Sequence, residues 1–327
     1  MKVAVVGSGG WGTALALVLL ENGHEVTLWS FSEKEAEILR TQRENPLLKG
    51  VALPAALKIC TEIACVAEKE LVVFATPSFA VRETAQKAAP YLGDGTLVVS
   101  VSKGIEKGTS LRLSQIIDEE TKGRCRIVAL SGPSHAEEVG RHVPTGCVAA
   151  SLDREAAEMV QDAFMNERFR IYSSPDIVGV ELAAALKNVI ALCYGVCDGL
   201  GYGDNTRALL MTRGLTETAR LGVAMGGKKE TFAGLAGVGD LIVTCTSMHS
   251  RNHRAGILIG QGKSVEEALK EVGAVVEGYY ATDTVRTLAG KYGIEMPISE
   301  GAYQVLYNDR HAKDVLMELM CRDKKHE

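Results

Sequence analysis

The stretch Gly7-Ser8-Gly9-Gly10-Trp11-Gly12 decides the fold, because its glycines have the spacing GxGxxG. It follows the apolar run 3–6 directly and precedes a segment, 11–22, that is expected to be helical. In such a strand–loop–helix unit the first glycine permits a tight turn, the second lets backbone approach a pyrophosphate, and the third lets helix and strand pack closely. The helix N-terminus adds unpaired N–H groups and positive potential. The stretch therefore predicts a dinucleotide-binding unit, in preference to a glycine-rich turn without a ligand.

Short apolar runs alternate with helical segments through the rest of the first half. Fully apolar strands that alternate with helices are typical of a parallel sheet covered on both faces, and right-handed crossovers make such a domain doubly wound. Two later strand-like runs, 147–150 and 169–172, either extend this sheet or form a small addition. The expected strands are 3–6, 25–29, 71–75, 96–101 and 126–130, and the expected helices between them include 81–89 and 110–119.

The character of the sequence changes near Pro175, beyond which almost no strand pattern remains. Helices are expected at 176–197, 205–221, 264–272, 281–292 and 298–307. We therefore predict an α/β protein. Its N-terminal doubly wound Rossmann domain, residues 1–178, binds the dinucleotide, and an all-helical C-terminal domain, residues 179–327, holds the substrate and the catalytic residues.

Composition excludes several classes of function. The 327 residues carry a formal net charge of −5 and no long basic run, so nucleic acid is a poor candidate partner. No uninterrupted apolar run approaches the roughly 20 residues of a membrane span, and no signal peptide is convincing, so we expect a cytoplasmic protein without membrane insertion. The eight cysteines form no CxxC pair, which favours buried, reduced thiols over disulfides or a metal site. Glycine occurs 34 times, more often than in an average protein, so the backbone turns sharply or approaches something closely at many places.

The end of the second strand bears on the choice of cofactor. NAD-dependent enzymes usually place Asp or Glu there for the ribose 2′-hydroxyl. Here the strand is followed by Ser30, Phe31 and Ser32, and the first carboxylate is Glu33. Ser30, Ser32 and Lys34 can contact a 2′-phosphate, although no arginine is present. We expect NADPH to be used at least as well as NADH.

Polar residues follow the strands of the first half at the edge where ligands bind in such sheets. Thr76 and Lys103 each come at the end of an apolar run. A strand-ending turn explains Thr76 equally well, and a solvated surface lysine is by itself the favoured explanation of Lys103. Ser134 is expected to cap a short helix, with Glu137 completing a capping box. Capping explains this motif without catalysis, so no role is assigned to His135.

Two motifs of the second half suggest chemistry. Lys187 lies on a helix face whose neighbours three and four residues away are Ala or Ile, so it is either a buried general acid and base or a lysine that reaches the surface. The glycines of 234–239 predict an irregular loop that delivers Asp240. Ser250 is expected to cap a helix that begins at Arg251, and an arginine at a helix N-terminus suits a phosphate. A phosphorylated substrate is therefore expected.

These motifs together resemble the bacterial NAD(P)-dependent glycerol-3-phosphate dehydrogenase family over essentially the whole chain. The matching segments are GSGGWGTALA at 7–16, ATPS at 75–78, SKGIE at 102–106, SGPSHAEE at 131–138, LKNVIAL at 186–192, GLAGVGDLIVTC at 234–245, HSRN at 249–252 and VEG at 276–278. Two departures are Gly10, where members often have Ser, and Phe31, near which members often have Arg or His.

The resemblance implies interconversion of dihydroxyacetone phosphate and sn-glycerol 3-phosphate by hydride transfer with NADP or NAD, which supplies glycerophospholipid synthesis. It implies that Lys187 donates and accepts the proton. The substrate-binding residues it implies are Lys103, Gly132, Ser134, Lys187, Asp240, Ser250, Arg251 and Asn252. The cofactor-binding residues are Gly7, Gly9, Gly10, Trp11, Gly12, Lys103, Ala136, Arg251, Val275 and Glu277. We also expect a homodimer, since the helical half is largely apolar.

Two alternatives stay open from the sequence. One is another dehydrogenase with the same two-domain plan, such as a 3-hydroxyacid or 6-phosphogluconate type. The other is a dinucleotide sensor without catalysis, which would keep the glycine loop but would not need Lys187, Asp240 and Arg251 together.

Overall fold

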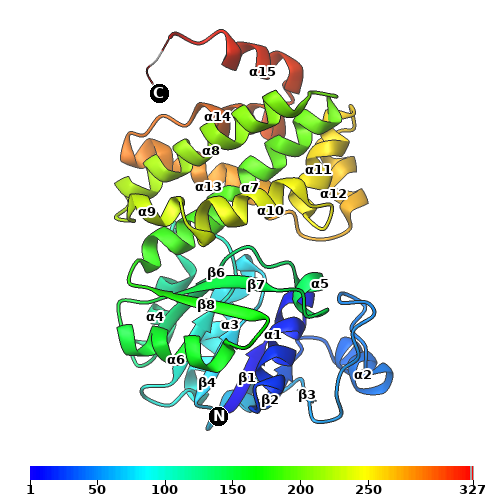
Figure 1. Cartoon of the computed structure of the whole chain (residues 1–327), viewed down its shortest axis with the longest axis vertical. Coiled ribbons are helices and arrows are strands. Elements are labelled where there is room, and N and C mark those ends of the chain that lie inside the picture. The colour runs from blue at the N-terminus through cyan, green and yellow to red at the C-terminus, as the bar shows by residue number, and fades with distance from the viewer. Residues whose placement is uncertain (325, 327) are drawn as a thin grey trace. The chain divides into compact units, whose positions relative to one another are not determined.

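The computed structural model describes residues 1–324 and 326, and this part of the chain forms two compact units, Met1–Glu181 and Leu182–Glu327 (Figure 1). The first unit is an α/β domain and the second is all-helical, which confirms the expected fold class. The change from one unit to the next falls within the long helix α7, Ile177–Gly199.

The first unit contains strands that alternate with helices. The strands are β1 (Lys2–Val6), β2 (Glu25–Trp29), β3 (Lys58–Cys60), β4 (Leu71–Phe74), β5 (Leu97–Ser100), β6 (Arg126–Ser131), β7 (Thr145–Ala150) and β8 (Phe169–Ser174). The helices are α1 (Gly10–Glu21), α2 (Glu33–Gln42), α3 (Val81–Ala88), α4 (Leu113–Thr121), α5 (Ala136–Val139) and α6 (Arg154–Phe164).

These strands form one sheet in the order β3-β2-β1-β4-β5-β6-β7-β8. The runs 147–150 and 169–172 form β7 and β8, which extend the sheet and do not form a separate small addition. The strands predicted as a parallel sheet do pair in parallel, whereas β7, which was left open, pairs with β6 antiparallel, with Leu130 opposite Ala149. The connection from β6 to β7 contains only the four-residue helix α5, which is too short for a crossover to the other end of the sheet. β3 was not predicted, since this edge strand has three partly exposed residues and no apolar run.

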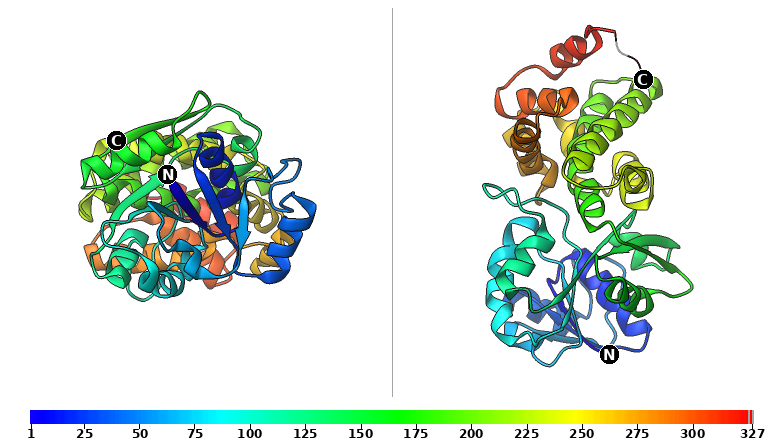
Figure 2. Two further views of the ribbon diagram at one scale, coloured as in Figure 1. Left: turned by 90° about the horizontal axis from the view of Figure 1, so that it is seen from below. Right: turned by 90° about the vertical axis from the view of Figure 1, so that its left-hand side faces the viewer.

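Both faces of the sheet are buried, as fully apolar strands predict. Val3 and Val5 of β1 pack on one face with residues of α1 and α6. Ala4 and Val6, which point to the other side, pack with residues of α3 and α4. The right-hand view of Figure 2 shows the sheet of this unit with helices on both sides. This arrangement leaves the carboxyl ends of β1 to β6 and the N-terminus of α1 at one edge.

The second unit consists of helices. After α7 these are α8 (Asp204–Ala224), α9 (Lys229–Phe232), α10 (Asp240–Thr246), α11 (Arg251–Gly260), α12 (Val265–Val272), α13 (Glu277–Tyr292), α14 (Pro297–Tyr307) and α15 (Ala312–Met320). The expected irregular loop before Asp240 is wrong, because Leu235–Gly239 forms a π-helical turn that runs into α10. Helix α7 is long and apolar enough to span a membrane, but 89% of its apolar window is buried inside the protein, as in a core helix.

The cysteine side chains carry free thiols in this structure. Cys147, Cys197 and Cys245 are buried, as expected from their apolar surroundings. The prediction of burial is wrong for the other five thiols, because Cys60, Cys65, Cys125 and Cys193 are only partly buried and Cys321 is exposed. Among residues 1–324 and 326, no group of three or more His, Cys, Asp or Glu side chains is arranged to hold a metal ion.

A buried carboxyl group links α8 to the start of α14. Glu217, 2% exposed, accepts hydrogen bonds from the backbone N–H groups of Ile298 (2.9 Å) and Ser299 (3.3 Å). Burial raises the pKa of Glu217 to about 7, although these two N–H groups and the nearby Arg220 act in the opposite direction. The packing of α14 on α8 thus includes a carboxyl group that titrates near neutral pH.

We expect replacement of Glu217 by Gln to change how the stability of the protein depends on pH. The folded-state pKa of about 7 lies above the ordinary value of 4.5, so the folded protein binds the proton more tightly. The contribution of this group to the free energy of unfolding therefore falls as pH rises from about 4.5 to about 7, by on the order of 3 kcal/mol. The melting temperature of Glu217→Gln minus that of the wild type should therefore be more positive at about pH 8 than at about pH 5. Thermal melts at both pH values measure this.

The matched control is Glu230→Gln, which removes an exposed carboxylate of the same unit. Its melting temperature should differ from that of the wild type by the same amount at both pH values. An equal difference at both pH values for Glu217→Gln would contradict the titration of a buried carboxyl group.

Candidate active site

The glycine loop between β1 and α1 has the geometry that its sequence predicts. Gly7 has φ +125°, and a Cβ there would lie 2.6 Å from the carbonyl oxygen of Ala75. A Cβ at Gly12 would lie 2.0 Å from the carbonyl oxygen of Gly7. In contrast, nothing lies within 4 Å of a Cβ placed on Gly9. Gly7 and Gly12 are therefore required by packing within the protein, whereas Gly9 leaves open space beside the backbone for a ligand.

Gly10, where members of the resembling family often have Ser, has little room for a side chain. A Cβ at Gly10 would lie 2.6 Å from the carbonyl oxygen of Leu47 and 3.6 Å from the Cβ of Ala136. A serine here would need the segment around Leu47 to move. Glycine at position 10, where family members often have Ser, is therefore required by the path of the segment around Leu47, which follows α2.

Hydrogen bonds from neighbouring segments hold the glycine loop in place. The Asn45 amide donates to the carbonyl oxygen of Ser8 (2.9 Å) and to the hydroxyl of Thr13 (2.6 Å), and its side chain is buried. The hydroxyl of Ser8 donates to that of Ser30 (2.8 Å), and the N–H of Gly7 donates to the carbonyl oxygen of Trp29 (3.1 Å). Sequence reasoning missed Asn45, because it lies in an irregular connection with no motif around it.

Trp11 contributes packing to this region. Its ring lies edge-to-face with Phe169, at 6.5 Å between ring centroids. Its Nε1 is buried and has no hydrogen-bond partner within the described chain.

The end of β2 places its hydroxyl groups differently from the expectation. The Ser30 hydroxyl is fully buried against Ser8, and Ser32 caps α2 by accepting the N–H of Glu35 (3.4 Å). The same helical turn brings the Glu35 carboxylate to within 3.5 Å of the Ser30 hydroxyl. The carboxylate that the strand end lacks in sequence is thus supplied five residues later by the first turn of α2. A carboxylate at this place suits a ribose 2′-hydroxyl, the group that distinguishes NAD from NADP.

Three predicted substrate residues gather beyond β5 and β6. The Lys103 ammonium donates to the carbonyl oxygen of Gly132 (3.2 Å), and the Ser134 hydroxyl donates to the same oxygen (3.0 Å). The predicted capping role of Ser134 is wrong. Helix α5 begins at Ala136, its N-cap residue is His135, and no side chain caps it. Because the chain stays extended through His135, Ser134 lies outside the first helical turn and bonds backward instead.

Lys187 is buried in the second unit, which decides against a lysine that reaches the surface. Its side chain is 6% exposed, and its Nζ lies 2.9 Å from Oδ1 of Asp240, itself 1% exposed. Nζ also donates to the hydroxyl of Thr244, and that hydroxyl donates to the carbonyl oxygen of Asp240 (2.6 Å). Thr244 was missed by sequence reasoning. The available signal was its position four residues after Asp240, on the same side of a helix.

The predicted phosphate-binding motif lies at the start of α11. Ser250 caps this helix by accepting the N–H of His253 (3.2 Å), as predicted, and Arg251 is exposed at its first position. The amide of Asn252 donates to Oδ1 of Asn188 (2.9 Å) and accepts the N–H of Gly278 (2.8 Å). Asn252 thereby joins three helices, α7, α11 and α13.

The remaining predicted residues lie close to this junction in sequence. Glu277 is the first residue of α13, next to the Gly278 N–H that Asn252 accepts, and Val275 precedes it by two residues. The amide of Asn188 bonds to the carbonyl oxygen of Ala184 (3.5 Å) and to Asn252. Of the predicted residues, Lys187, Asp240, Ser250, Arg251, Asn252, Val275 and Glu277 lie in the second unit, and Lys103, Gly132, Ser134, Ala136 and the glycine loop lie in the first. Within the second unit, direct contacts join Lys187 with Asp240 and Asn252 with Asn188 and Gly278.

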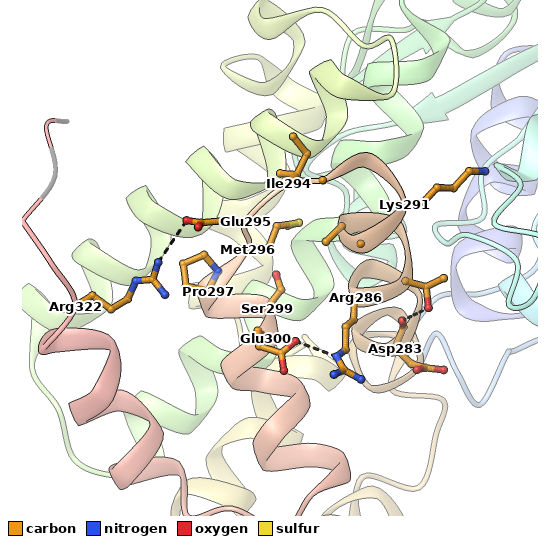
Figure 3. A pocket seen from close by; sticks show the side chains of 14 residues that line it. Asp283, Arg286, Lys291, Ile294, Glu295, Met296, Pro297, Ser299, Glu300 and Arg322 are labelled. Carbon is orange, nitrogen blue, oxygen red and sulfur yellow. Dashed lines mark hydrogen bonds and ion pairs between the residues drawn. The ribbon is translucent and has the colours of Figure 1, made fainter.

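A separate groove of about 730 Å³ lies between α13, α14 and the C-terminal segment (Figure 3). Ion pairs cross it, between Arg286 and Glu300 (2.9 Å) and between Arg322 and Glu295 (3.5 Å). None of the predicted site residues lines this groove, so its size does not make it the candidate active site.

Comparison with known families and proteins agrees with this geometry. Residues 2–157 match the model of the NAD-dependent glycerol-3-phosphate dehydrogenase N-terminus, and residues 176–317 match that of the C-terminus. The chain belongs to the NAD-dependent glycerol-3-phosphate dehydrogenase family.

Individual members of the family match the whole chain. The glycerol-3-phosphate dehydrogenase (NAD(P)+) of Desulfitobacterium hafniense is 54% identical over 327 residues, covering 100% of this chain and 93% of that protein. The enzyme of the same name from Moorella thermoacetica is 55% identical over 328 residues, covering 100% and 97%. The crystal structure of glycerol-3-phosphate dehydrogenase from Coxiella burnetii, 37% identical, covers 98% of this chain and 99% of its own, with a TM-score of 0.94.

The geometry of the glycine loop predicts that one substitution weakens NADPH binding and another lowers the stability of the protein. We expect Gly9→Ala to leave the melting temperature unchanged, because its Cβ meets nothing, and to weaken NADPH binding by about tenfold or more, because its methyl group occupies the space that a pyrophosphate needs. Gly12→Ala should instead lower the melting temperature, since its Cβ collides with the backbone of Gly7. Thermal melts and fluorescence titration with NADPH measure both. Normal NADPH affinity in Gly9→Ala would show that the cofactor does not approach this backbone.

Proposed function

We propose that this chain interconverts dihydroxyacetone phosphate and sn-glycerol 3-phosphate by hydride transfer with NADPH or NADH, and so supplies glycerophospholipid synthesis. The observation that carries the proposal is the buried Lys187 ammonium held by Asp240 and Thr244, in a chain that belongs to this dehydrogenase family. A dinucleotide sensor without catalysis has no use for a buried, paired lysine, and the cost of burying it points to chemistry.

The residues of the first unit suit a nicotinamide dinucleotide. The open backbone at Gly9 and the N-terminus of α1 favour a pyrophosphate, and Gly7, Gly10, Trp11 and Gly12 shape the loop. We assign Lys103 and Ala136 to the rim of this cofactor site, and Arg251, Val275 and Glu277 of the second unit to the same cofactor. When bound, the nicotinamide supplies or accepts the hydride.

Lys187 holds and moves the proton. During reduction, negative charge grows on the carbonyl oxygen of dihydroxyacetone phosphate, and the Lys187 ammonium stabilises this charge and then protonates the oxygen. In the reverse direction the neutral amine accepts the proton of the alcohol. Asp240 orients the ammonium through the 2.9 Å contact, and Thr244 accepts a second N–H of Nζ.

The substrate phosphate is assigned to the start of α11. The exposed Arg251 guanidinium and the N-terminus of this helix both favour an anion. Ser250 and Asn252 hold this turn in place through the cap and through the contacts with Asn188 and Gly278. We assign Lys103, Gly132 and Ser134 to the remaining polar groups of the substrate.

The domain roles follow from these assignments. We propose that residues 1–178 bind the cofactor and that residues 179–327 bind the substrate and carry Lys187. We further propose that the enzyme is a cytoplasmic homodimer, because the helical half is rich in apolar residues.

The test of this function is the oxidation of NADPH when dihydroxyacetone phosphate is added to the purified protein. Lys187→Ala should lower kcat by about 100-fold or more with little change in KM, since it removes proton transfer and charge stabilisation. Arg251→Ala should mainly raise the KM for dihydroxyacetone phosphate, because it removes a charged contact with the phosphate. Near-normal turnover of Lys187→Ala would remove this lysine from the mechanism.

Cofactor preference provides a second test. The buried Ser30 and the capping Ser32 remove the basis for the expected use of NADPH at least as well as NADH, and Glu35→Gln should shift the ratio of kcat/KM toward NADPH relative to the wild type. The reason is that Glu35, 3.5 Å from the Ser30 hydroxyl, repels a 2′-phosphate and favours a 2′-hydroxyl. Steady-state kinetics with both cofactors measure the ratio. An unchanged ratio in Glu35→Gln would contradict this expectation.

A further inference from the structure

Helices α7 and α11 of the second unit approach each other through glycines on both sides. A Cβ at Gly195 would lie 2.1 Å from the carbonyl oxygen of His253, and one at Gly256 would lie 2.1 Å from that of Leu192. One turn further along, Gly199 and Gly260 would collide with the opposite helix in the same way, at 2.2 and 2.3 Å. We call this contact, formed by Gly195, Gly199, Gly256 and Gly260, the α7–α11 seam. No other residue type fits it without moving the helix backbones.

Helices α7 and α11 run parallel to each other along the seam. The pairs that meet are 188 with 252, 195 with 256 and 199 with 260, so residue numbers rise together on both helices. The first pair is the hydrogen bond from the Asn252 amide to Asn188, at 2.9 Å. Glycine inside a helix destabilises it relative to alanine, so four glycines facing one another are costly unless the close approach itself is needed.

Beside the seam, a buried histidine ties the first turn of α11 to α7. His253 is 4% exposed, and its Nε2 lies 2.7 Å from Oδ2 of Asp198. Because a carboxylate can only accept, Nε2 carries the proton of this bond. The other carboxylate oxygen of Asp198 accepts from Arg207 (2.7 Å), and the ring of Tyr194 lies edge-on to the imidazole at 5.4 Å. The Asp198 carboxylate is thus held from two sides and in turn holds the imidazole.

The residues tied together are the sequence neighbours of the groups assigned to chemistry. Asn188 follows Lys187 directly on α7, and Arg251 lies between Ser250 and Asn252 at the start of α11. His253 is held at two points, since its backbone N–H donates to the Ser250 hydroxyl and its Nε2 donates to Asp198, while its Nδ1 lies 3.3 Å from the carbonyl oxygen of Ser247. A shift of α11 along or away from α7 would therefore move Arg251 relative to Lys187.

We propose that the α7–α11 seam and the Asp198–His253 pair are a positioning device that sets the distance between the phosphate-binding end of α11 and Lys187. His253 and Asp198 are positioning residues, which act through Arg251 and touch no reacting atom. This role rests on the function proposed above. The distance that this device sets determines how well binding of the substrate phosphate places the carbonyl group beside Lys187. A small displacement of a binding group lowers the rate even when the catalytic groups are intact.

The substrate pair of dihydroxyacetone phosphate and unphosphorylated dihydroxyacetone separates positioning from general damage. For His253→Leu we expect kcat/KM for dihydroxyacetone phosphate to fall about tenfold or more, through a higher KM, and kcat/KM for dihydroxyacetone to change by less than about twofold. His253→Gln keeps a side-chain N–H that can reach Asp198, so it should restore most of the activity with the phosphorylated substrate.

The seam itself is tested by Gly256→Ala, with Gly290→Ala as the matched control. Gly290 lies on the exposed side of α13, where an added Cβ meets nothing within 4 Å. Gly256→Ala must push the two helices apart, so it should show the same selective loss with dihydroxyacetone phosphate, while Gly290→Ala should match the wild type with both substrates. If Gly256→Ala does not fold, the two His253 variants decide the question.

Equal losses with both substrates in His253→Leu would overturn the proposal, since they would indicate a purely structural role. Unchanged activity with both substrates, or the same loss in His253→Gln as in His253→Leu, would overturn it as well. Failure of the proposed function has a different signature. In that case the wild-type protein itself does not oxidise NADPH with dihydroxyacetone phosphate, whatever the variants do.

Discussion

The close approach of one backbone segment to another is the constraint on which the rest of this structure depends. In the first unit Gly12 lies so near the carbonyl oxygen of Gly7 that a Cβ would be 2.0 Å away. In the second unit a Cβ on Gly256 would lie 2.1 Å from the carbonyl oxygen of Leu192. In both units the contact holds the N-terminus of a helix, α1 or α11, against a neighbouring element. Because packed backbone deforms very little, each helix end presents its N–H groups in a defined place.

A second constraint is the buried charge of Lys187. An unpaired ammonium in the interior costs several kcal/mol, so the fold has to provide a carboxylate within contact distance, and Asp240 does so at 2.9 Å. This pair connects α7 to α10, and Thr244 adds a contact from the next turn of α10. The π-helical turn at Leu235–Gly239 leads directly into α10, so the local backbone irregularity lies next to the residue that holds the lysine.

The parts of the site that were predicted from sequence are those whose signal is local. The glycine spacing, the cap at Ser250 and the apolar surroundings of Lys187 each lie within a few residues. The missed contacts join distant segments, as Asn45 does with Ser8, or need a helical turn to form first, as Thr244 and Glu35 do. The cap expected at Ser134 failed for a related reason, because a capping-box pattern does not say where the chain becomes helical.

By itself the sequence determined the fold class, the change from α/β to all-helical structure, and the kinds of residue available for chemistry. Period and apolarity carry this information, since both are properties of neighbouring residues along the chain. Only the tertiary structure decided that β7 runs antiparallel to β6, that Lys187 is buried against Asp240, and that glycines of α7 and α11 face one another. These features depend on which distant segments meet. Burial and hydrogen bonding between such segments are properties of the folded chain and leave no pattern among neighbouring residues in the sequence.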